Sequence, residues 1–366
     1  MSTTQVVDLE DTEGLLAADR DALLRGASMA GAQVRAVAAA ANEGELDALR
    51  DSVVRSVIWV AGRGTAATAG VMLSSTLGAV AAQPIVVATE APPWIGPLDV
   101  LVVAGDDPGD PALVGAAAVG VRRGARVVVV APYEGPLRDS TAGRAAVLPP
   151  RLLVPDEFGL CRYLAAGVAV LQAVDPKLRT DLAALADELD AETLRNSAAR
   201  DVFTNPAKSL AARVSDFRVA LAGDSAATVA LARHGSSTML RIGNEVVAAA
   251  GLADAVVALR TGSSGLSAEQ ALFHDEELDG PLPERLRVLV LTLAGERTVV
   301  AARVAGLDAV DLITAEDVPE VPDTPGGLTG STGFPAQGGA AGAEQQLAVL
   351  AVRLEMAAVY LRLVRG

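Results

Sequence analysis

The sequence predicts an α/β protein with two doubly wound halves, each a parallel sheet covered by helices. Two observations predict this fold class. Short continuous runs of Val, Ile and Leu alternate with helical patterns, which is typical of strands buried on both faces of a parallel sheet. The order of strand, tight turn and helix also occurs twice, starting near residue 56 and again near residue 218.

The first half follows an N-terminal segment, 12–48, in which leucines recur at the spacing of one or two amphipathic helices. Strands are expected at 56–61, 85–88, 100–104, 126–131 and 145–148. Helices are expected at 66–78, 111–123, 156–174 and 176–196.

The second half begins with a strand at 218–222, a Gly-Asp-Ser turn and a helix that runs to about 234. Further elements are expected as strands at 256–259, 287–293 and 310–313, and a helix at 296–305. The expected divisions are N-terminal helices 1–50, a first domain 51–197, a second domain 198–317, a flexible linker 318–343 and a C-terminal helix 344–366.

The linker is predicted from its many Pro and Gly residues, which leave no periodic apolar face. The tethered C-terminal helix carries an apolar stripe that includes Leu347, Leu350 and Leu354. Such a stripe must be covered. We expect it to dock either on its own chain or on a partner subunit.

Charge and composition argue against nucleic-acid binding, membrane binding and membrane insertion. The formal charge of −15 disfavours nucleic acid and anionic membranes as partners. No uninterrupted apolar run reaches the length of a membrane span, and no signal peptide is evident. A single cysteine, Cys161, rules out an intrachain disulfide and fits a reducing cytoplasm, and its apolar neighbours place it in a packed helix. A cytoplasmic location is therefore expected.

The turn Gly62-Arg63-Gly64-Thr65 joins the first strand to its helix. Free N–H groups at such a helix N-terminus can hold an anion, although the glycines are also compatible with a tight turn and nothing more. Arg63 and Arg151 are candidate anion contacts because a guanidinium binds phosphate through two N–H groups. A dinucleotide site is disfavoured because Ala67 stands where the fingerprint requires its third glycine.

Glu245 and His274 are candidate acid–base residues. Each side chain can be tuned toward neutral pH by its surroundings, and together they suit proton transfer next to a sugar carbonyl. The alternative for both is a solvated polar residue. The other histidine, His234, is expected to be solvated at a polar helix end.

Four segments in this order resemble the sugar isomerase (SIS) fold, and above all its bifunctional phosphoglucose/phosphomannose isomerases. They are Ala61–Thr65, Pro149-Pro150-Arg151, Asn244-Glu245 and Phe273-His274-Asp275-Glu276. The resemblance implies that Glu245 is the catalytic base and that His274, supplied by the neighbouring subunit, assists ring opening. It places Gly62, Arg63, Gly64, Thr65 and Arg151 on the phosphate side. It also implies a homodimer that needs no cofactor and no metal.

The turn after the third strand departs from this pattern. Where the family has Ser-Tyr-Ser-Gly-Asn-Thr, this chain has Val102-Val103-Ala104-Gly105-Asp106-Asp107, so phosphate-binding hydroxyls are replaced by carboxylates. Carboxylates here, with Asp110, suit either a hard cation or a solvated turn.

Three functions remain open. The first is isomerisation of glucose or mannose 6-phosphate to fructose 6-phosphate through an enediol. The second is a non-catalytic protein that binds a sugar phosphate or nucleotide sugar and regulates or scaffolds sugar metabolism. The third is a structural partner whose pocket has closed.

Overall fold

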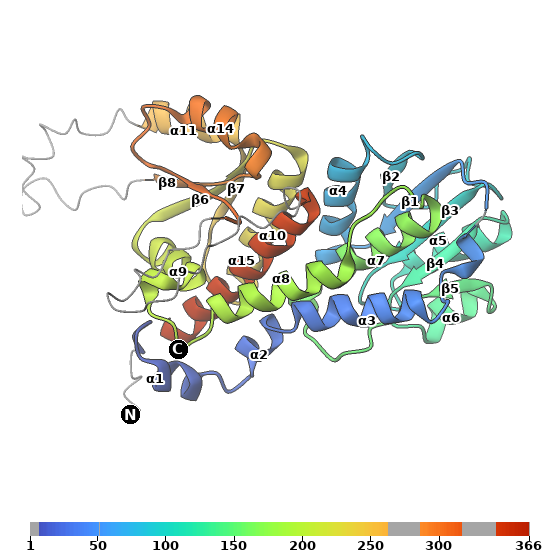
Figure 1. Ribbon diagram of the computed structural model, residues 1–366, viewed down its shortest axis with the longest axis horizontal. Coiled ribbons are helices and arrows are strands. Elements are labelled where there is room, and N and C mark those ends of the chain that lie inside the picture. The colour runs from blue at the N-terminus through green and yellow to red at the C-terminus, as the bar shows by residue number, and fades with distance from the viewer. Residues whose placement is uncertain (1–6, 51, 263–285, 317–341, 366) are drawn as a thin grey trace, which may run out of the picture.

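A computed structural model describes residues 7–50, 52–262, 286–316 and 342–365, and the chain forms two parallel sheets with helices packed between and around them (Figure 1). This confirms the predicted α/β class with two doubly wound parallel sheets. The first sheet comprises β1 Ser56–Ala61, β2 Ile85–Ala88, β3 Asp99–Ala104, β4 Arg126–Val130 and β5 Ala145–Val147. The second comprises β6 Arg218–Gly223, β7 Ala248–Gly251, β8 Leu286–Leu291 and β9 Val310–Ile313.

The two sheets have the same winding. The strand order is β2-β1-β3-β4-β5 in the first and β7-β6-β8-β9 in the second, and all neighbours are parallel. In each sheet the chain therefore reverses its winding between two adjacent strands, β1 and β3 or β6 and β8. Crevices at the carboxyl ends of strands at such a switch point are where α/β proteins bind ligands.

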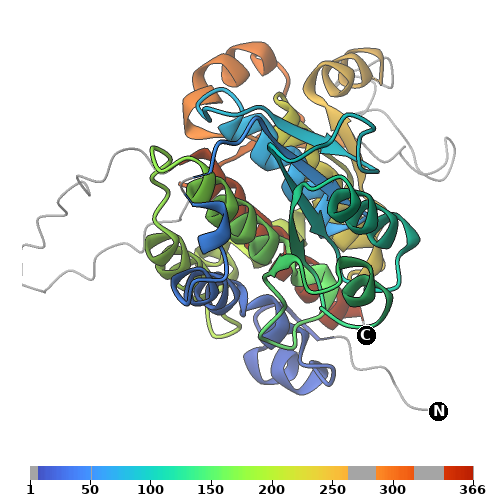
Figure 2. The same cartoon turned by 90° about the vertical axis from the view of Figure 1, so that its right-hand side faces the viewer.

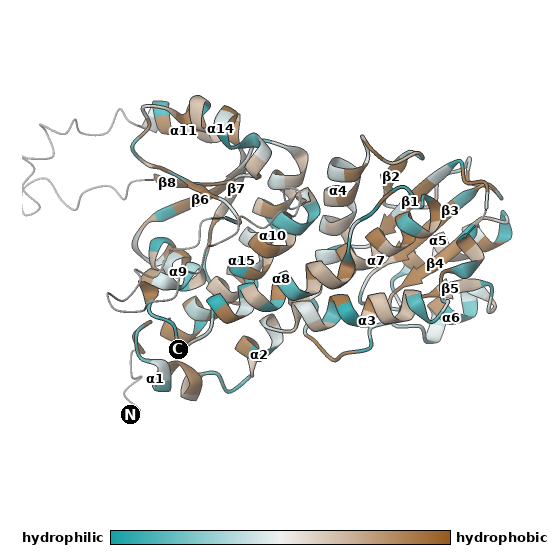
Figure 3. Ribbon diagram, viewed as in Figure 1, coloured by the Kyte–Doolittle hydropathy of each residue, from teal (hydrophilic) through white to brown (hydrophobic). Residues whose placement is uncertain are grey.

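Helices cover both faces of the first sheet, as the view along the long axis shows (Figure 2). Strands of both sheets are strongly hydrophobic (Figure 3), as doubly covered parallel strands must be. The α-helices are α1 Thr12–Ala18, α2 Leu23–Ala27, α3 Ala30–Asn42, α4 Thr65–Leu77, α5 Pro111–Arg122, α6 Gly135–Thr141, α7 Leu160–Val174, α8 Leu182–Arg195, α9 Pro206–Asp216, α10 Ala226–Arg241, α11 Leu252–Gly262, α14 Arg297–Val304 and α15 Ala343–Arg365. Short 3₁₀ turns are η1 Asp47–Leu49, η2 Asp156–Phe158, η3 Val202–Thr204 and η4 Ala294–Glu296.

One continuous hydrophobic core joins the facing sides of the two sheets. It contains side chains from β1 and β3, from β6 and β8, and from the helices α4, α7, α10 and α15 between them. The outer face of the first sheet has a separate core under α5, and the outer face of the second has another under α11 and α14. The helices α4, α7, α10 and α15 therefore form an inner layer shared by both halves.

The strand expected at 256–259 is wrong, because this stretch belongs to α11 and the strand is β7, Ala248–Gly251. Leu252, Ala255 and Leu259 are buried at helical spacing while Val257 is 60% exposed. A short apolar run does not distinguish a buried strand from one face of a helix.

Other boundaries also differ. The N-terminal segment forms three α-helices, the second long helix begins at Leu182, and the helices α6 and α9 were not expected. Both unexpected helices have Pro in the first turn, where its missing N–H costs nothing. Residues 318–341 of the predicted linker 318–343 lie outside the described residues, and the helix that follows begins at Ala343.

The terminal helix α15 docks on its own chain. It packs against α9, α10 and α8 in the inner layer (Figure 1). Almost every residue from Gln346 to Leu361 is buried, so the helix is enclosed on all sides and not along a single stripe. Cys161 in α7 is buried against it, with Sγ 3.9 Å from the carbonyl oxygen of Ala348, which confirms the packed cysteine.

Two charged residues of α15 are buried with partners. Arg353 Nε lies 2.8 Å from Glu192 Oε1, and its Nη1 donates to the carbonyl of Thr314. Glu355 lies 2.9 Å from His234 Nε2. The expectation that His234 is solvated is therefore wrong, because α10 continues to Arg241 and places His234 in the middle of the helix, where α15 covers it.

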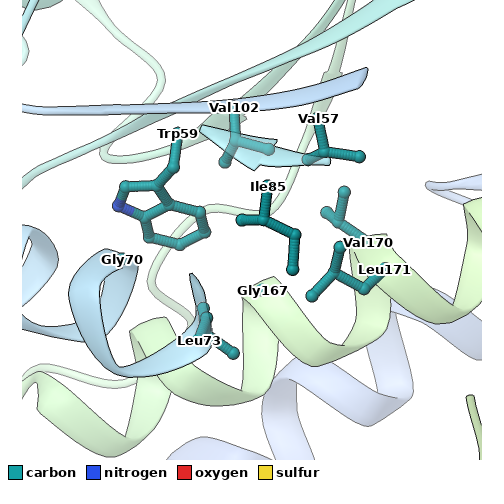
Figure 4. A pocket seen from close by; sticks show the side chains of 9 residues that line it. All are labelled: Val57, Trp59, Gly70, Leu73, Ile85, Val102, Gly167, Val170 and Leu171. Atoms are coloured by element: carbon teal, nitrogen blue, oxygen red, sulfur yellow. The ribbon is translucent and has the colours of Figure 1, made fainter. Parts of the chain in front are cut away.

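Close packing between β1, α4 and α7 depends on two glycines. Gly70 lies against the ring of Trp59, and Gly167 lies against Leu73 (Figure 4). A cavity of only about 10 Å³ remains among the apolar side chains there, which is too small and too apolar for a ligand.

We predict that Gly167→Ala lowers the free energy of unfolding by about 1–3 kcal/mol, because the added methyl group would collide with Leu73 in a filled core. Gly115→Ala in α5 is the matched control, since no atom lies within 4 Å of the new Cβ. It should be neutral or stabilising by up to about 1 kcal/mol, the helix preference of Ala over Gly. Chemical denaturation measures both, and equal effects would contradict this packing.

We predict a pH-dependent contribution from Glu192. Burial by itself would raise the pKa of Glu192, but the charge and hydrogen bonds of Arg353, together with Asn196, hold it below the ordinary 4.5. A depressed carboxyl pKa adds stability above the unfolded value, and that stability is lost as the pH falls. The difference in unfolding free energy between wild type and Glu192→Gln should therefore be largest near neutral pH and shrink below pH 4.5. A difference that is independent of pH would contradict the ion pair.

Candidate functional site

The candidate site lies at the carboxyl edge of the first sheet, at its switch point. Ala61 at the end of β1 pairs with Ala104 at the end of β3. The turns that follow these strands, 62–64 and 105–110, therefore start side by side. One turn leads into α4 in the inner layer and the other into α5 on the outer face.

The N-terminus of α4 has no side-chain cap. Gly64 occupies the cap position with φ of 67°, a conformation that favours glycine. The equivalent helix in the second half, α10, is closed by a reciprocal capping box between Ser225 and Thr228. Only the first of these two matching termini keeps first-turn N–H groups free of a side-chain cap, and such groups can hold an anion.

The predicted residues of the turn after β1 differ in exposure and in contacts. Arg63 is exposed, and no hydrogen bond or ion pair of its side chain involves another described residue. Thr65 is buried, and its hydroxyl donates to the carbonyl of Asp156 in η2 at 3.2 Å. Gly62 lies directly against the carboxylate of Asp110, so any Cβ there would collide with it.

The carboxylates of the turn after β3 all have partners. Asp106 Oδ1 accepts hydrogen bonds from Arg162 Nη2 at 2.8 Å and from the Tyr163 hydroxyl at 2.6 Å. Asp107 accepts from the N–H of Gly109, and Asp110 caps α5. Within the described ranges, no group of three or more His, Cys, Asp or Glu side chains is arranged to hold a metal ion.

Arg162 was not among the predicted site residues, although it bonds to this turn through Asp106. It is only 7% exposed, and its guanidinium carbon lies 4.1 Å from the centre of the Tyr163 ring. Its Nη1 is buried without a hydrogen-bond partner in the described part of the chain. The sequence gives one sign of its burial, because Arg162 is an arginine within the apolar run around Cys161.

The Arg162 cluster, which is Arg162, Tyr163 and Asp106, lies near the α4 terminus. A Cβ placed on Gly159 would lie 3.4 Å from the Thr65 hydroxyl and 3.5 Å from a ring carbon of Tyr163. Burial raises the pKa of Tyr163 above its ordinary value, so its hydroxyl remains a donor at neutral pH.

Glu245 lies in the loop between α10 and β7. The residue before it, Asn244, has φ of 49°, and the Glu245 N–H donates to the carbonyl of Met239 at 3.0 Å. Its carboxylate forms an ion pair with Arg365 near the end of α15, and its side chain is 22% exposed. The predicted base is therefore accessible but already holds a guanidinium.

Arg151 follows the carboxyl end of β5 and lies away from the switch point. Arg151 forms two hydrogen bonds with the carboxylate of Glu43, at 2.8 and 2.5 Å, so its guanidinium is already occupied. It follows β5, which is separated from β1 by β3 and β4. His274 lies outside the described residues.

A larger polar cavity of about 120 Å³ lies between η2 and the C-terminal ends of α10 and α15. Arg241 bridges Asp156 at 3.2 Å and Glu157 at 2.8 Å along one wall. Burial and the neighbouring Asp156 raise the pKa of Glu157. Burial would also raise the pKa of Asp156, but hydrogen bonds from Glu157 and Arg241 bring it below the ordinary value. Arg362 on the other wall pairs with Asp21. The charged side chains of this cavity thus pair with one another.

Comparison with known proteins identifies the fold. No family model matches the sequence, and no curated protein sequence matches it. Across the described ranges, no helix is both long and apolar enough to cross a membrane.

Solved structures match over nearly the whole chain. Tagatose-6-phosphate ketose/aldose isomerase from Escherichia coli is 14% identical with a TM-score of 0.59, covering 100% of this chain and 95% of its own. The C-terminal domain of glucosamine-fructose-6-phosphate aminotransferase from Francisella tularensis is 9% identical with a TM-score of 0.56, covering 96% of each chain. A glucose-6-phosphate isomerase like protein from Thermus thermophilus is 18% identical with a TM-score of 0.52, covering 98% and 96%. The chain therefore has the fold of the phosphosugar isomerases.

Proposed function

We propose that this chain recognises a sugar phosphate at the carboxyl edge of its first sheet and acts by binding it. The observation that carries the proposal is the uncapped N-terminus of α4 beside an exposed Arg63 and the buried Arg162 cluster. Helix amides and a guanidinium are the groups that hold phosphate oxygens in proteins. Structural likeness to proteins named for sugar 6-phosphates supports this class of ligand.

Binding is better supported than turnover. A base that abstracts a proton next to a carbonyl must reach the substrate, and the Glu245 carboxylate is held by Arg365. Arg151 is held by Glu43. The turn after β3 presents carboxylates where the isomerase pattern has hydroxyls. A protein that senses a sugar phosphate or nucleotide sugar, or scaffolds a metabolic partner, needs only the binding groups.

The proposal includes a homodimer. If the site is shared between subunits, His274 of one copy would serve the site of the other, and the described residues of one chain would form only part of it. No cofactor or metal enters the proposal.

We predict that mannose 6-phosphate or glucose 6-phosphate binds the wild type and that Arg63→Gln weakens binding roughly tenfold, because one charge-assisted hydrogen bond to phosphate is lost. Titration calorimetry measures the dissociation constants. Arg122→Gln is the matched control, since Arg122 is also exposed but lies at the far end of α5. No binding by the wild type, or equal weakening in both variants, would contradict the proposed site.

The second candidate function is the isomerase itself, which the partial exposure of Glu245 favours. The test is a coupled assay for conversion of mannose 6-phosphate and glucose 6-phosphate to fructose 6-phosphate. We predict no turnover above background for wild type, with Glu245→Gln binding the ligand as wild type does. Turnover that disappears in Glu245→Gln would replace the binding proposal with the isomerase.

A further inference from the structure

We propose that Asp106 and Arg162 form a subsite for the hydroxyl groups of the sugar, while the phosphate is held on the α4 side. This inference rests on the proposed function, because it divides the same site between the two parts of a sugar phosphate. In this proposal the turn after β3 binds the hydroxyl groups of the sugar and not its phosphate.

The charge of the turn disfavours a phosphate dianion. The Asp106 carboxylate neutralises the Arg162 guanidinium through a 2.8 Å hydrogen bond. Asp107 adds a further carboxylate in the same turn, while Asp110 caps α5. Like charges repel over these distances, so the turn after β3 disfavours a second anion. The α4 terminus, with its uncapped amides and Arg63, is the part of this edge that favours one.

The hydrogen-bonding capacity that remains suits a hydroxyl group. Asp106 Oδ1 takes both donors, from Arg162 and Tyr163, and in the structure as described Oδ2 makes no hydrogen bond. The Asp106 side chain is 34% exposed, so a ligand can reach this acceptor. Arg162 Nη1 is a donor that lacks an acceptor among the described residues. A sugar hydroxyl both donates and accepts, whereas a phosphate dianion only accepts.

The buried arginine adds an energetic reason. A buried donor without an acceptor destabilises the protein, and the effect is larger when the donor is charged. An oxygen supplied from outside the chain next to Asp106 would relieve it, once the groups that cover the buried Nη1 move aside. Ligand binding there gains a strong hydrogen bond on each side, since both protein groups are ionised.

The two subsites are close enough for one small ligand. Asp110 from the turn after β3 lies against Gly62 of the turn after β1, and Thr65 and Tyr163 both flank Gly159. A sugar whose phosphate lies on the α4 amides therefore extends toward Asp106.

The test compares Asp106→Asn with Asp107→Asn by titration with glucose 6-phosphate, mannose 6-phosphate and inorganic phosphate. Asp107 is the matched control, because it removes one charge from the same turn but bonds only to the Gly109 amide. We expect Asp106→Asn to weaken sugar-phosphate binding roughly tenfold to a hundredfold, the effect of one charge-assisted hydrogen bond. Inorganic phosphate should bind this variant as tightly as wild type or more tightly. Asp107→Asn should bind the sugar phosphates as wild type does.

Several outcomes overturn the inference. Unchanged sugar-phosphate binding in Asp106→Asn would show that Asp106 makes no bond to the ligand, and tighter binding would make it an internal anion that blocks the site. Equal affinity of wild type for inorganic phosphate and both sugar phosphates would leave no role for a hydroxyl subsite. If wild type binds none of the three, the proposed function fails as well, which separates the two failures. Should Asp106→Asn not fold, Tyr163→Phe removes one donor to Asp106, and it should weaken sugar-phosphate binding while sparing inorganic phosphate.

Discussion

The buried ion pair between Arg353 and Glu192 is the constraint on which the rest of the structure depends. Both side chains are almost fully enclosed, at 1% and 0% exposure. Removing one partner of such a pair leaves an uncompensated buried charge, which costs about 3–5 kcal/mol. The pair joins α15, at the end of the chain, to α8 in the middle, so the final helix is held inside the layer between the two sheets.

This constraint explains how a helix that is apolar on nearly all sides adopts one position. Hydrophobic contacts alone allow α15 to slide or rotate, because they are not directional. Arg353 with Glu192 and Glu355 with His234 each fix one point on the helix. Toward its end, Arg362 bonds Asp21 and Arg365 bonds Glu245, so the same helix also ties down the N-terminal segment and the predicted base. The position of Glu245 is thus a consequence of how α15 docks.

The local sequence predicts those elements whose residues alone identify them. β1, β3 and β4 are unbroken Val/Ile/Leu-rich runs, and the Gly-Arg-Gly-Thr turn specifies the start of α4. The stretch 256–259 could not be assigned, because four apolar residues do not reveal their period. The environments of His234, Arg151 and Arg162 depend on Glu355, Glu43 and Asp106, which lie 121, 108 and 56 positions away. Such pairs cannot be predicted from neighbouring residues, and this is why the sequence predicted an anion-binding turn at 62–65 but not the burial of Arg162.

The most direct measurement is a crystal structure with mannose 6-phosphate bound. The account predicts the phosphate on the first-turn amides of α4 beside Arg63, with sugar hydroxyls between Asp106 and Arg162. Phosphate bound to Arg162 with Asp106 displaced would contradict the division into two subsites. Phosphate bound beside Arg241 and Arg362, in the cavity behind η2, would contradict the assignment of the site to the edge of the first sheet.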